Sequence, residues 1–237
     1  AINPCFAREH VSRMKAICQE CLSRWIQTRL EPLAKSQQPL DILAEMLQVT
    51  CEVICLAAFE YRTTMQERSD LLRDMQTVVS ELLMNRAANP FRSCYEFLLP
   101  GAHNAYRARR RVREFARKRL DEYRMRNAGA AATRGKDLAA GSTKKNEHLS
   151  IIQAIAENSN YESDEDRIDD FVALMVGGHE STASTLAWVF LELARHHDIQ
   201  NELSVALRRE SAIENRLTNS LLKDVVRESM RLNPVFP

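Results

Sequence analysis

Two adjacent glycines, a histidine, a carboxylate and two hydroxyls follow one another at residues 177–182, inside a long apolar stretch. Apolar side chains dominate on both sides of this run, at residues 168–176 and 186–194. A helix that is apolar on nearly all sides belongs in a protein core, but each glycine costs about 1 kcal/mol relative to alanine in a helix interior. Burial of the polar groups that follow is unfavourable unless they find partners. We therefore expect the helix to open locally at Gly177 and Gly178 and to leave room for a ligand.

A second candidate motif stands near the end of the chain. Residues 221–234 follow an amphipathic helical pattern, which Pro234 ends. Glu228 and Arg231 lie three residues apart, so a carboxylate and a guanidinium share one helix face and can pair. By itself such a pair is common on protein surfaces and contributes little to stability.

In this order and at this spacing, the two motifs resemble those of the cytochrome P450 family of haem-thiolate monooxygenases. That family carries a small-Gly-x-acid-Thr-Thr sequence in its long central helix, which residues 177–182 resemble. It also carries an E-x-x-R motif followed by Arg-Leu-x-Pro, which residues 228–234 match. Residues 193–200 resemble the family's link into the next helix, and residues 41–59 resemble an earlier core helix. The resemblance implies that residues 1–237 form an all-α part of one mainly helical domain.

The resemblance also implies a reaction. A complete member of the family uses haem to activate dioxygen and inserts one oxygen atom into a small apolar organic substrate. Its electrons come from a redox partner such as a flavin reductase or a ferredoxin. The competing interpretation is a non-enzymatic helical interaction module, or an inactive truncated gene product that keeps the sequence without the activity.

Roles for individual residues follow from the same resemblance. Gly177 and Gly178 would form the groove in which dioxygen binds over the iron, and a spacing of four residues aligns Ala173, Gly177 and Ser181 on the face toward the haem. Positioned proton donors typically accelerate reactions about 10²–10⁴-fold. The family usually has threonine where Ser181 stands; serine keeps the hydroxyl but lacks the methyl that restricts its rotamer. The expected site comprises Ala173, Gly177, Gly178, Ser181 and Val235 at the haem, Glu180, Ser181 and Thr182 as proton-relay residues, and Glu228 and Arg231 as a buried structural pair.

Two parts of the family pattern are expected outside this sequence. Residues 1–6 resemble the tail of a helix whose preceding tryptophan and arginine face the haem, with a membrane anchor earlier still. The loop Phe-x-x-Gly-x-Arg-x-Cys-x-Gly, which carries the proximal cysteine ligand, would follow much later, and none of the cysteines here stands in such a context. We therefore expect no metal ligand in this chain and an inactive isolated fragment. For a eukaryotic protein the resemblance implies the cytosolic face of the endoplasmic reticulum membrane.

Composition sets wider limits. The 237 residues are 45% hydrophobic and 27% charged, with a net charge of +1, which suits one sizeable core and gives no general attraction to nucleic acid. The chain has few glycines and prolines, and no strand-like alternation persists, so an all-helical fold is favoured. The lone pair Cys18 and Cys21 lies on an apolar helix face and is interpreted as buried thiols rather than a zinc site.

Apolar periodicity and turn residues predict the order of the helices. They are expected at residues 8–31, 40–60, 65–86, 103–126, 149–156, 165–195, from 199 onward, and 218–232. Residues 127–147 are rich in Ala, Gly, Ser, Thr and Lys and are predicted to be a mobile surface loop. The many arginines between residues 107 and 119 are interpreted as a solvated helix face, with contact to an anionic membrane surface as the alternative.

The sequence His179-Glu180 matches the start of the H-E-x-x-H zinc motif. Ala183 stands where the second histidine is required, so we do not expect a zinc site. His179 is predicted to be a polar residue on the far side of the central helix.

Overall fold

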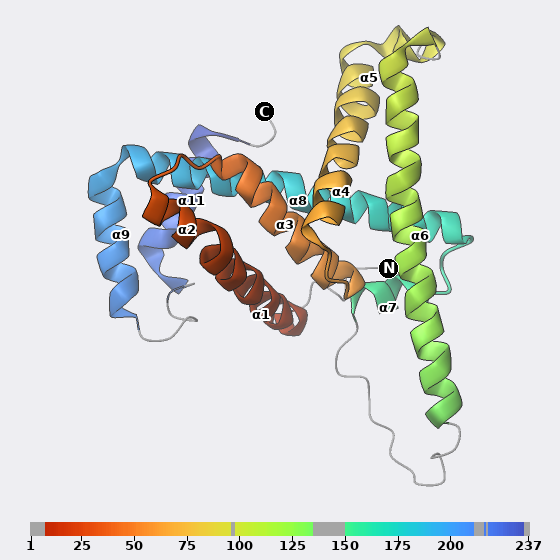
Figure 1. The fold of residues 1–237 in the computed structure, drawn as a ribbon, viewed down its shortest axis with the longest axis horizontal. Helices are drawn as coiled ribbons and strands as arrows, with labels where there is room; N and C mark the ends of the chain where they lie inside the picture. The colour runs from red at the N-terminus through yellow and green to blue at the C-terminus, as the bar shows by residue number, and fades with distance from the viewer. Residues whose placement is uncertain (1–7, 96–97, 135–149, 211–215, 217, 235–237) are drawn as a thin grey trace.

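Helices account for all of the regular secondary structure that the computed structural model describes, which confirms the predicted all-α class. The described residues are 8–95, 98–134, 150–210, 216 and 218–234 (Figure 1).

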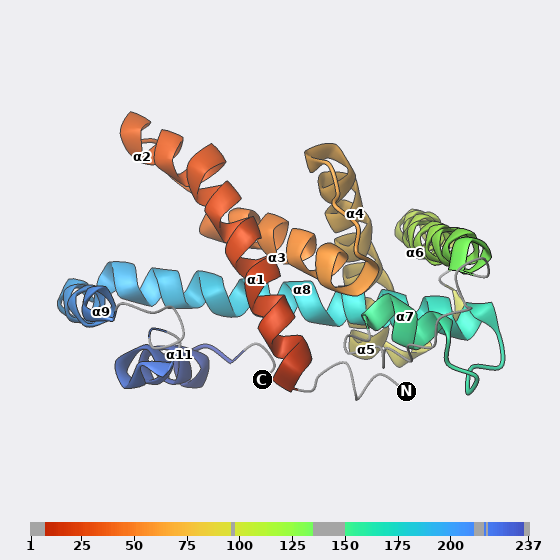
Figure 2. The same ribbon diagram turned by 90° about the horizontal axis from the view of Figure 1, so that it is seen from below.

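Two long helices cross at the centre of the molecule (Figures 1 and 2). They are α3, Ile42–Phe59, and α8, Asp164–Arg195, and they share the most extensive interface in the described structure. Phe59 of α3 and Phe171 of α8 stack with ring centroids 4.8 Å apart, and both side chains are buried. The predicted ranges 40–60 and 165–195 are therefore close to the observed helices.

Local sequence explains where these two helices begin. The Asp41 carboxylate accepts a hydrogen bond from the Ala44 N–H and caps α3. Ser163 and Asp166 form a capping box at the start of α8, each side chain bonding the other's backbone N–H. Such reciprocal bonds satisfy amide groups that the first helical turn leaves without partners.

The first predicted helix divides into three pieces. Helix α1, Arg8–Trp25, continues through the π-helical turn Ile26–Leu30 into α2, Glu31–Ser36. Pro32 was expected to end the helix, but it lies in the first turn of α2, where its missing N–H is tolerated. Figure 2 shows α1 crossing α3 on the way to α2.

A helical hairpin extends from this centre (Figure 1). Its first arm consists of α4, Met65–Val78, a π-helical turn Val79–Met84 and α5, Asn85–Ala88. A 3₁₀ turn, Pro90–Cys94, leads toward the second arm, α6, Pro100–Arg134. The remaining helices are α7, Ile151–Ala156, α9, His197–Arg209, and α11, Ser220–Leu232.

Helix α6 is longer than predicted. It continues to Arg134, so residues 127–134, which were assigned to a mobile loop, are helical. Alanine is the best helix former, and this segment contains several. The rest of the predicted loop, 135–147, lies outside the described residues.

Buried carboxylates on α3 bind its neighbours. The Trp25 indole N–H donates to Glu45 at 2.8 Å, and Arg29 Nη2 donates to the same carboxylate at 2.6 Å. Glu52 forms an ion pair with Arg68 of α4 at 2.9 Å. Burial raises the pKa of Glu52; at Glu45 burial acts in the same direction, but the hydrogen bonds from Arg29 and Trp25 outweigh it and lower the pKa.

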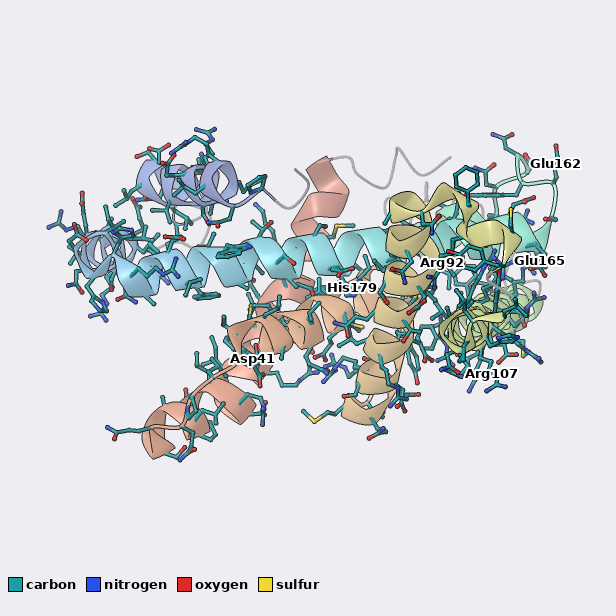
Figure 3. All side chains as sticks on the ribbon, turned by 90° about the horizontal axis from the view of Figure 1, so that it is seen from above. Asp41, Arg92, Arg107, Glu162, Glu165 and His179 are labelled. Carbon is teal, nitrogen blue, oxygen red and sulfur yellow. The ribbon has the colours of Figure 1, made fainter. Side chains whose placement is uncertain are left out.

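Several arginines of α6 also have internal partners. Arg113 and Arg117 both pair with Glu165 in the first turn of α8, and Arg124 pairs with Asp164 at 2.7 Å. Figure 3 shows Glu165 where α6 passes the start of α8. The hydrogen bond from Arg124 is the main cause that lowers the pKa of Asp164 to about 2. Within the run 107–119, Arg119 is buried and Arg113 is 18% exposed, so the interpretation as a solvated face is wrong for these two residues, whereas Arg117 stays 48% exposed.

Helix α3 is the described helix whose length and apolar composition would suffice to cross a membrane. Half of that segment is buried against the rest of the molecule, a property that core helices of globular proteins share. Its position at the centre of the fold accounts for its apolar character.

Candidate functional site

Helix α8 does not open at its glycines. It runs as one uninterrupted α-helix, so the expected local break at Gly177 and Gly178 is wrong for this structure. The Ser181 hydroxyl donates to the Gly177 carbonyl at 2.7 Å, and the Thr182 hydroxyl donates to the Gly178 carbonyl at 2.9 Å. These bonds to the preceding turn give the hydroxyls partners inside the helix, and bonds of this kind bend helices and slightly destabilise them.

The two glycines have different surroundings. A Cβ atom at Gly178 would lie 3.2 Å from Cδ1 of Ile54 on α3, tighter than ordinary van der Waals contact. A Cβ atom at Gly177 would meet no atom of another residue within 4 Å. Gly178 therefore permits the close approach of α3. This packing role explains the glycine without a ligand. Gly177 leaves the adjoining face of the helix, about 100° around the axis, open.

An apolar groove of about 700 Å³ lies between α1, α3 and α8. Helix α8 contributes Ala173, Gly177, Gly178 and Thr182 to it, so the structure brings together four of the expected site residues. Ser181 and Glu180, between the glycines and Thr182, are half-buried. The facing walls are formed by Met14, Cys18 and Leu22 of α1 and by Val53, Ile54 and Ala57 of α3.

The residues on this side of α8 fit a flat, mostly apolar group such as haem. Ala173 and Gly177 are exposed and carry almost no side chain, so a planar molecule can approach the helix backbone there. Cys18 is the described cysteine that lines the groove. Burial raises the pKa of its thiol, and iron would need the thiolate. Cys18 is therefore poorly suited to the proximal position.

His179 is buried, with a side chain that is 0% exposed. The prediction that it is a polar residue on the far side of the helix missed this burial. Its Nδ1 lies 2.7 Å from the Met175 carbonyl oxygen, and its Nε2 is buried without a hydrogen-bond partner among the described residues. Burial is the main cause that lowers the pKa of His179, which favours the neutral ring. Figure 3 shows the residue in the middle of α8.

Glu228 and Arg231 form the expected pair but lie on the surface of this chain. Two hydrogen bonds of 2.8 and 2.6 Å join the guanidinium to the carboxylate. Their side chains are 55% and 67% exposed in this chain, so the expectation of a buried pair, which concerns the complete protein, stays a prediction. Val235, the other expected haem contact near this end, lies outside the described residues.

Sequence analysis missed the burial of His179 and the groove walls on α1 and α3. A signal for the first was present, because Met175, His179 and Ala183 recur every four residues and therefore share one helix face. No comparable signal identified Cys18 or Ile54 as groove residues, since their periodicity indicates burial without naming the opposite helix.

The glycine surroundings predict different outcomes for two similar substitutions. Gly177→Ala should stabilise the protein by up to about 1 kcal/mol, because alanine is the better helix former and its methyl group meets no atom. Gly178→Ala should gain less or lose stability, because Ile54 must move. Urea unfolding of both variants measures the difference, and equal stabilities would contradict the assignment of the two faces.

The burial of His179 predicts a stability that decreases in mild acid. Its pKa is lowered in the folded state from the ordinary 6.5, so below that pH the unfolded chain binds a proton that the folded chain does not. The contribution of the neutral His179 ring to the free energy of unfolding is complete above pH 6.5. It decreases on acidification, by at most about 1.4 kcal/mol per pH unit. His179→Phe should lose less stability than wild type between pH 7 and pH 5.5. His103→Phe is the control, because His103 makes the same type of bond, to Leu99, on an exposed surface; similar pH profiles for wild type and His179→Phe would refute the idea.

Comparison with known proteins places these features in a family. A model of the family "Cytochrome P450" matches residues 2–237. "Cytochrome P450 4F8" of Homo sapiens is 26% identical over 212 residues, which cover 84% of this chain and 40% of the relative. "Cholesterol side-chain cleavage enzyme, mitochondrial" of Oncorhynchus mykiss is 43% identical over 68 residues, 26% of this chain and 13% of the relative. The chain thus spans less than half the length of these curated relatives.

A solved structure shares this fold. The heme domain of cytochrome P450DA, a crystal structure, superposes with a TM-score of 0.66 at 14% sequence identity. The match covers 97% of this chain and 48% of that one, so the helical order described above is shared almost throughout. The match of the family model over residues 2–237 shows that this chain belongs to the cytochrome P450 family.

Proposed function

We propose that this chain forms the distal part of a haem-dependent monooxygenase that inserts one oxygen atom of dioxygen into a small apolar organic substrate. The observation that carries the proposal is the open face of Ala173 and Gly177 beside the apolar groove, with Glu180 and Ser181 in the same helical turn. Haem, when bound, supplies the redox chemistry that activates dioxygen. The electrons come from a redox partner, a flavin reductase or a ferredoxin. Ala173, Gly177, Gly178 and Val235 would hold the haem.

Ser181 and Glu180 deliver protons in this proposal, and Thr182 supports them from the groove. In the described conformation the Ser181 hydroxyl proton is used in a bond to the Gly177 carbonyl. A neutral hydrogen bond contributes only about 0.5–1.5 kcal/mol net, so the hydroxyl can leave that carbonyl at small cost and turn toward a ligand. Serine, which lacks the methyl of threonine, changes rotamer more freely. Glu180 then passes to Ser181 a proton that it takes from solvent.

The location that we propose, for a eukaryotic protein, is the cytosolic face of the endoplasmic reticulum membrane. One ground is the match to the human relative. The other is that, in the family that this sequence resembles, a membrane anchor precedes the region to which this chain corresponds. One relative is named as mitochondrial. Fluorescence microscopy of the tagged full-length protein with markers for both organelles decides between them.

Replacing the serine tests the proposed chemistry. In the complete, haem-loaded protein, Ser181→Ala should keep the haem but divert electrons to peroxide or water, because the proton donor next to the ligand is lost. The amount of product formed per reduced nicotinamide consumed should fall severalfold. Thr185→Ala is the matched control, since Thr185 makes the same type of bond one turn later. Unchanged coupling in Ser181→Ala would show that Ser181 is not the donor, and absence of a haem-thiolate spectrum in the wild type would refute the function itself.

We propose that Glu228 and Arg231 are structural rather than catalytic, and that other parts of the complete protein cover this pair. A charge left without its partner in a covered site is strongly destabilising. Glu228→Gln and Arg231→Gln should therefore each lower the yield of folded, haem-loaded protein. Asp224→Asn removes a neighbouring pair with the same spacing on the same helix, Asp224 with Arg227, and should not. Full haem content and unchanged heat stability in both variants of the first pair would make it an ordinary surface pair.

A further inference from the structure

His179 lies on a buried face of α8, next to the residue where α8 closely approaches α3. Its side chain is fully buried, on the same face as the buried residues Met175 and Ala183. At the neighbouring Gly178 the side chain of Ile54 from α3 leaves only 3.2 Å for an added Cβ atom. The imidazole is thus fixed by packing, within the turn that contains both glycines.

The hydrogen bond of His179 defines its tautomer. A carbonyl oxygen only accepts hydrogen bonds, so the Nδ1 atom, 2.7 Å from the Met175 oxygen, must carry the hydrogen. In the neutral ring Nε2 then has a lone pair and no hydrogen. Nε2 has no hydrogen-bond partner among the described residues, so the ring bonds to them through Nδ1.

Two further side-chain bonds reach carbonyls of the same turn, from the half-buried Ser181 and the exposed Thr182. Ser181 bonds the Gly177 carbonyl and Thr182 bonds the Gly178 carbonyl. Because a helix turns by about 100° per residue, Ser181 lies roughly 200° around α8 from His179. One edge of the helix is therefore held by a buried ring, whereas the opposite edge is held by a hydroxyl that can exchange its partner for water or a ligand.

We propose that His179 is a positioning residue for the glycine turn of α8. Its buried ring holds the Met175 carbonyl on the buried face of the helix. When the helix loosens at Gly177 and Gly178, the carbonyls that become free are then those on the side of Ser181. His179 thereby directs the freed backbone groups and the Ser181 hydroxyl toward the open face, where the proposed function places the reaction. The effect on catalysis rests on the proposed function, whereas the effect of His179 on the conformation of the helix turn does not.

Three substitutions separate the two ring nitrogens. Asparagine places an amide nitrogen at the position of Nδ1, glutamine places one near the position of Nε2, and phenylalanine fills the space with neither. Amide hydrogen exchange of residues 179–182 is the readout, measured on the purified protein. We expect exchange about two- to tenfold faster in His179→Phe than in wild type, and near wild-type exchange in His179→Asn. His103→Phe, which removes the equivalent bond on an exposed surface, should leave these amides unchanged.

Several results would overturn the proposal. Wild-type protection in His179→Phe, or rescue by glutamine but not by asparagine, would show that the bond to Met175 does not hold the turn. Nitrogen-15 NMR of the wild-type imidazole gives an answer even where a variant fails to fold, because a hydrogen on Nε2 instead of Nδ1 contradicts the assigned bond.

The effect on catalysis is measured separately. In the haem-loaded complete protein, His179→Phe should lower product formed per nicotinamide consumed by a few fold, and His179→Asn should restore most of it. Equal coupling in both variants would remove the catalytic part of the proposal. If the wild type forms no product at all, the proposed function fails, while the exchange measurements still decide whether His179 holds the turn.

Discussion

The contact between α3 and α8 is the constraint on which the rest of the structure depends. It buries the aromatic pair Phe59 and Phe171 and brings Ile54 against Gly178, where an added methyl group would require the Ile54 side chain to shift. Close packing of this kind leaves little freedom for rotation of either helix. The orientation of α8 about its axis is therefore set by α3, and with it the direction in which Gly177, Glu180 and Ser181 point.

Charged residues attach the other helices to this pair without filling the groove. Glu52 on α3 holds α4 through Arg68, and the acidic first turn of α8 holds α6 through arginines such as Arg124. Pairs at the surface add little free energy because water competes for both partners. The nearly buried Glu52 differs, since loss of its partner would leave a carboxylate with little access to water. Apolar side chains of the outer helices, such as Met75 of α4 and Leu120 of α6, belong to the same core, and the ion pairs add contacts around it.

The candidate site combines a rigid and an adaptable side on one helix. His179 is buried in the core, whereas Gly177 and Gly178 are exposed beside the groove. Hydroxyls that bond the helix's own carbonyls can exchange partners at small cost. A ligand site needs both properties, because precise placement requires a fixed support and a reacting ligand requires groups that can turn toward it.

The sequence by itself determined the helical class, the order and approximate limits of the helices, and the family, because periodicity and two spaced motifs are local properties of the chain. It also identified Ala173, Gly177, Gly178 and Thr182, which the structure places along one groove. Only the tertiary structure decided that α8 stays continuous, that His179 is buried and that the arginines of α6 pair with α8. Those outcomes depend on which helix lies opposite each face. A periodic pattern shows that a face is buried, but the partner across it comes from another part of the chain.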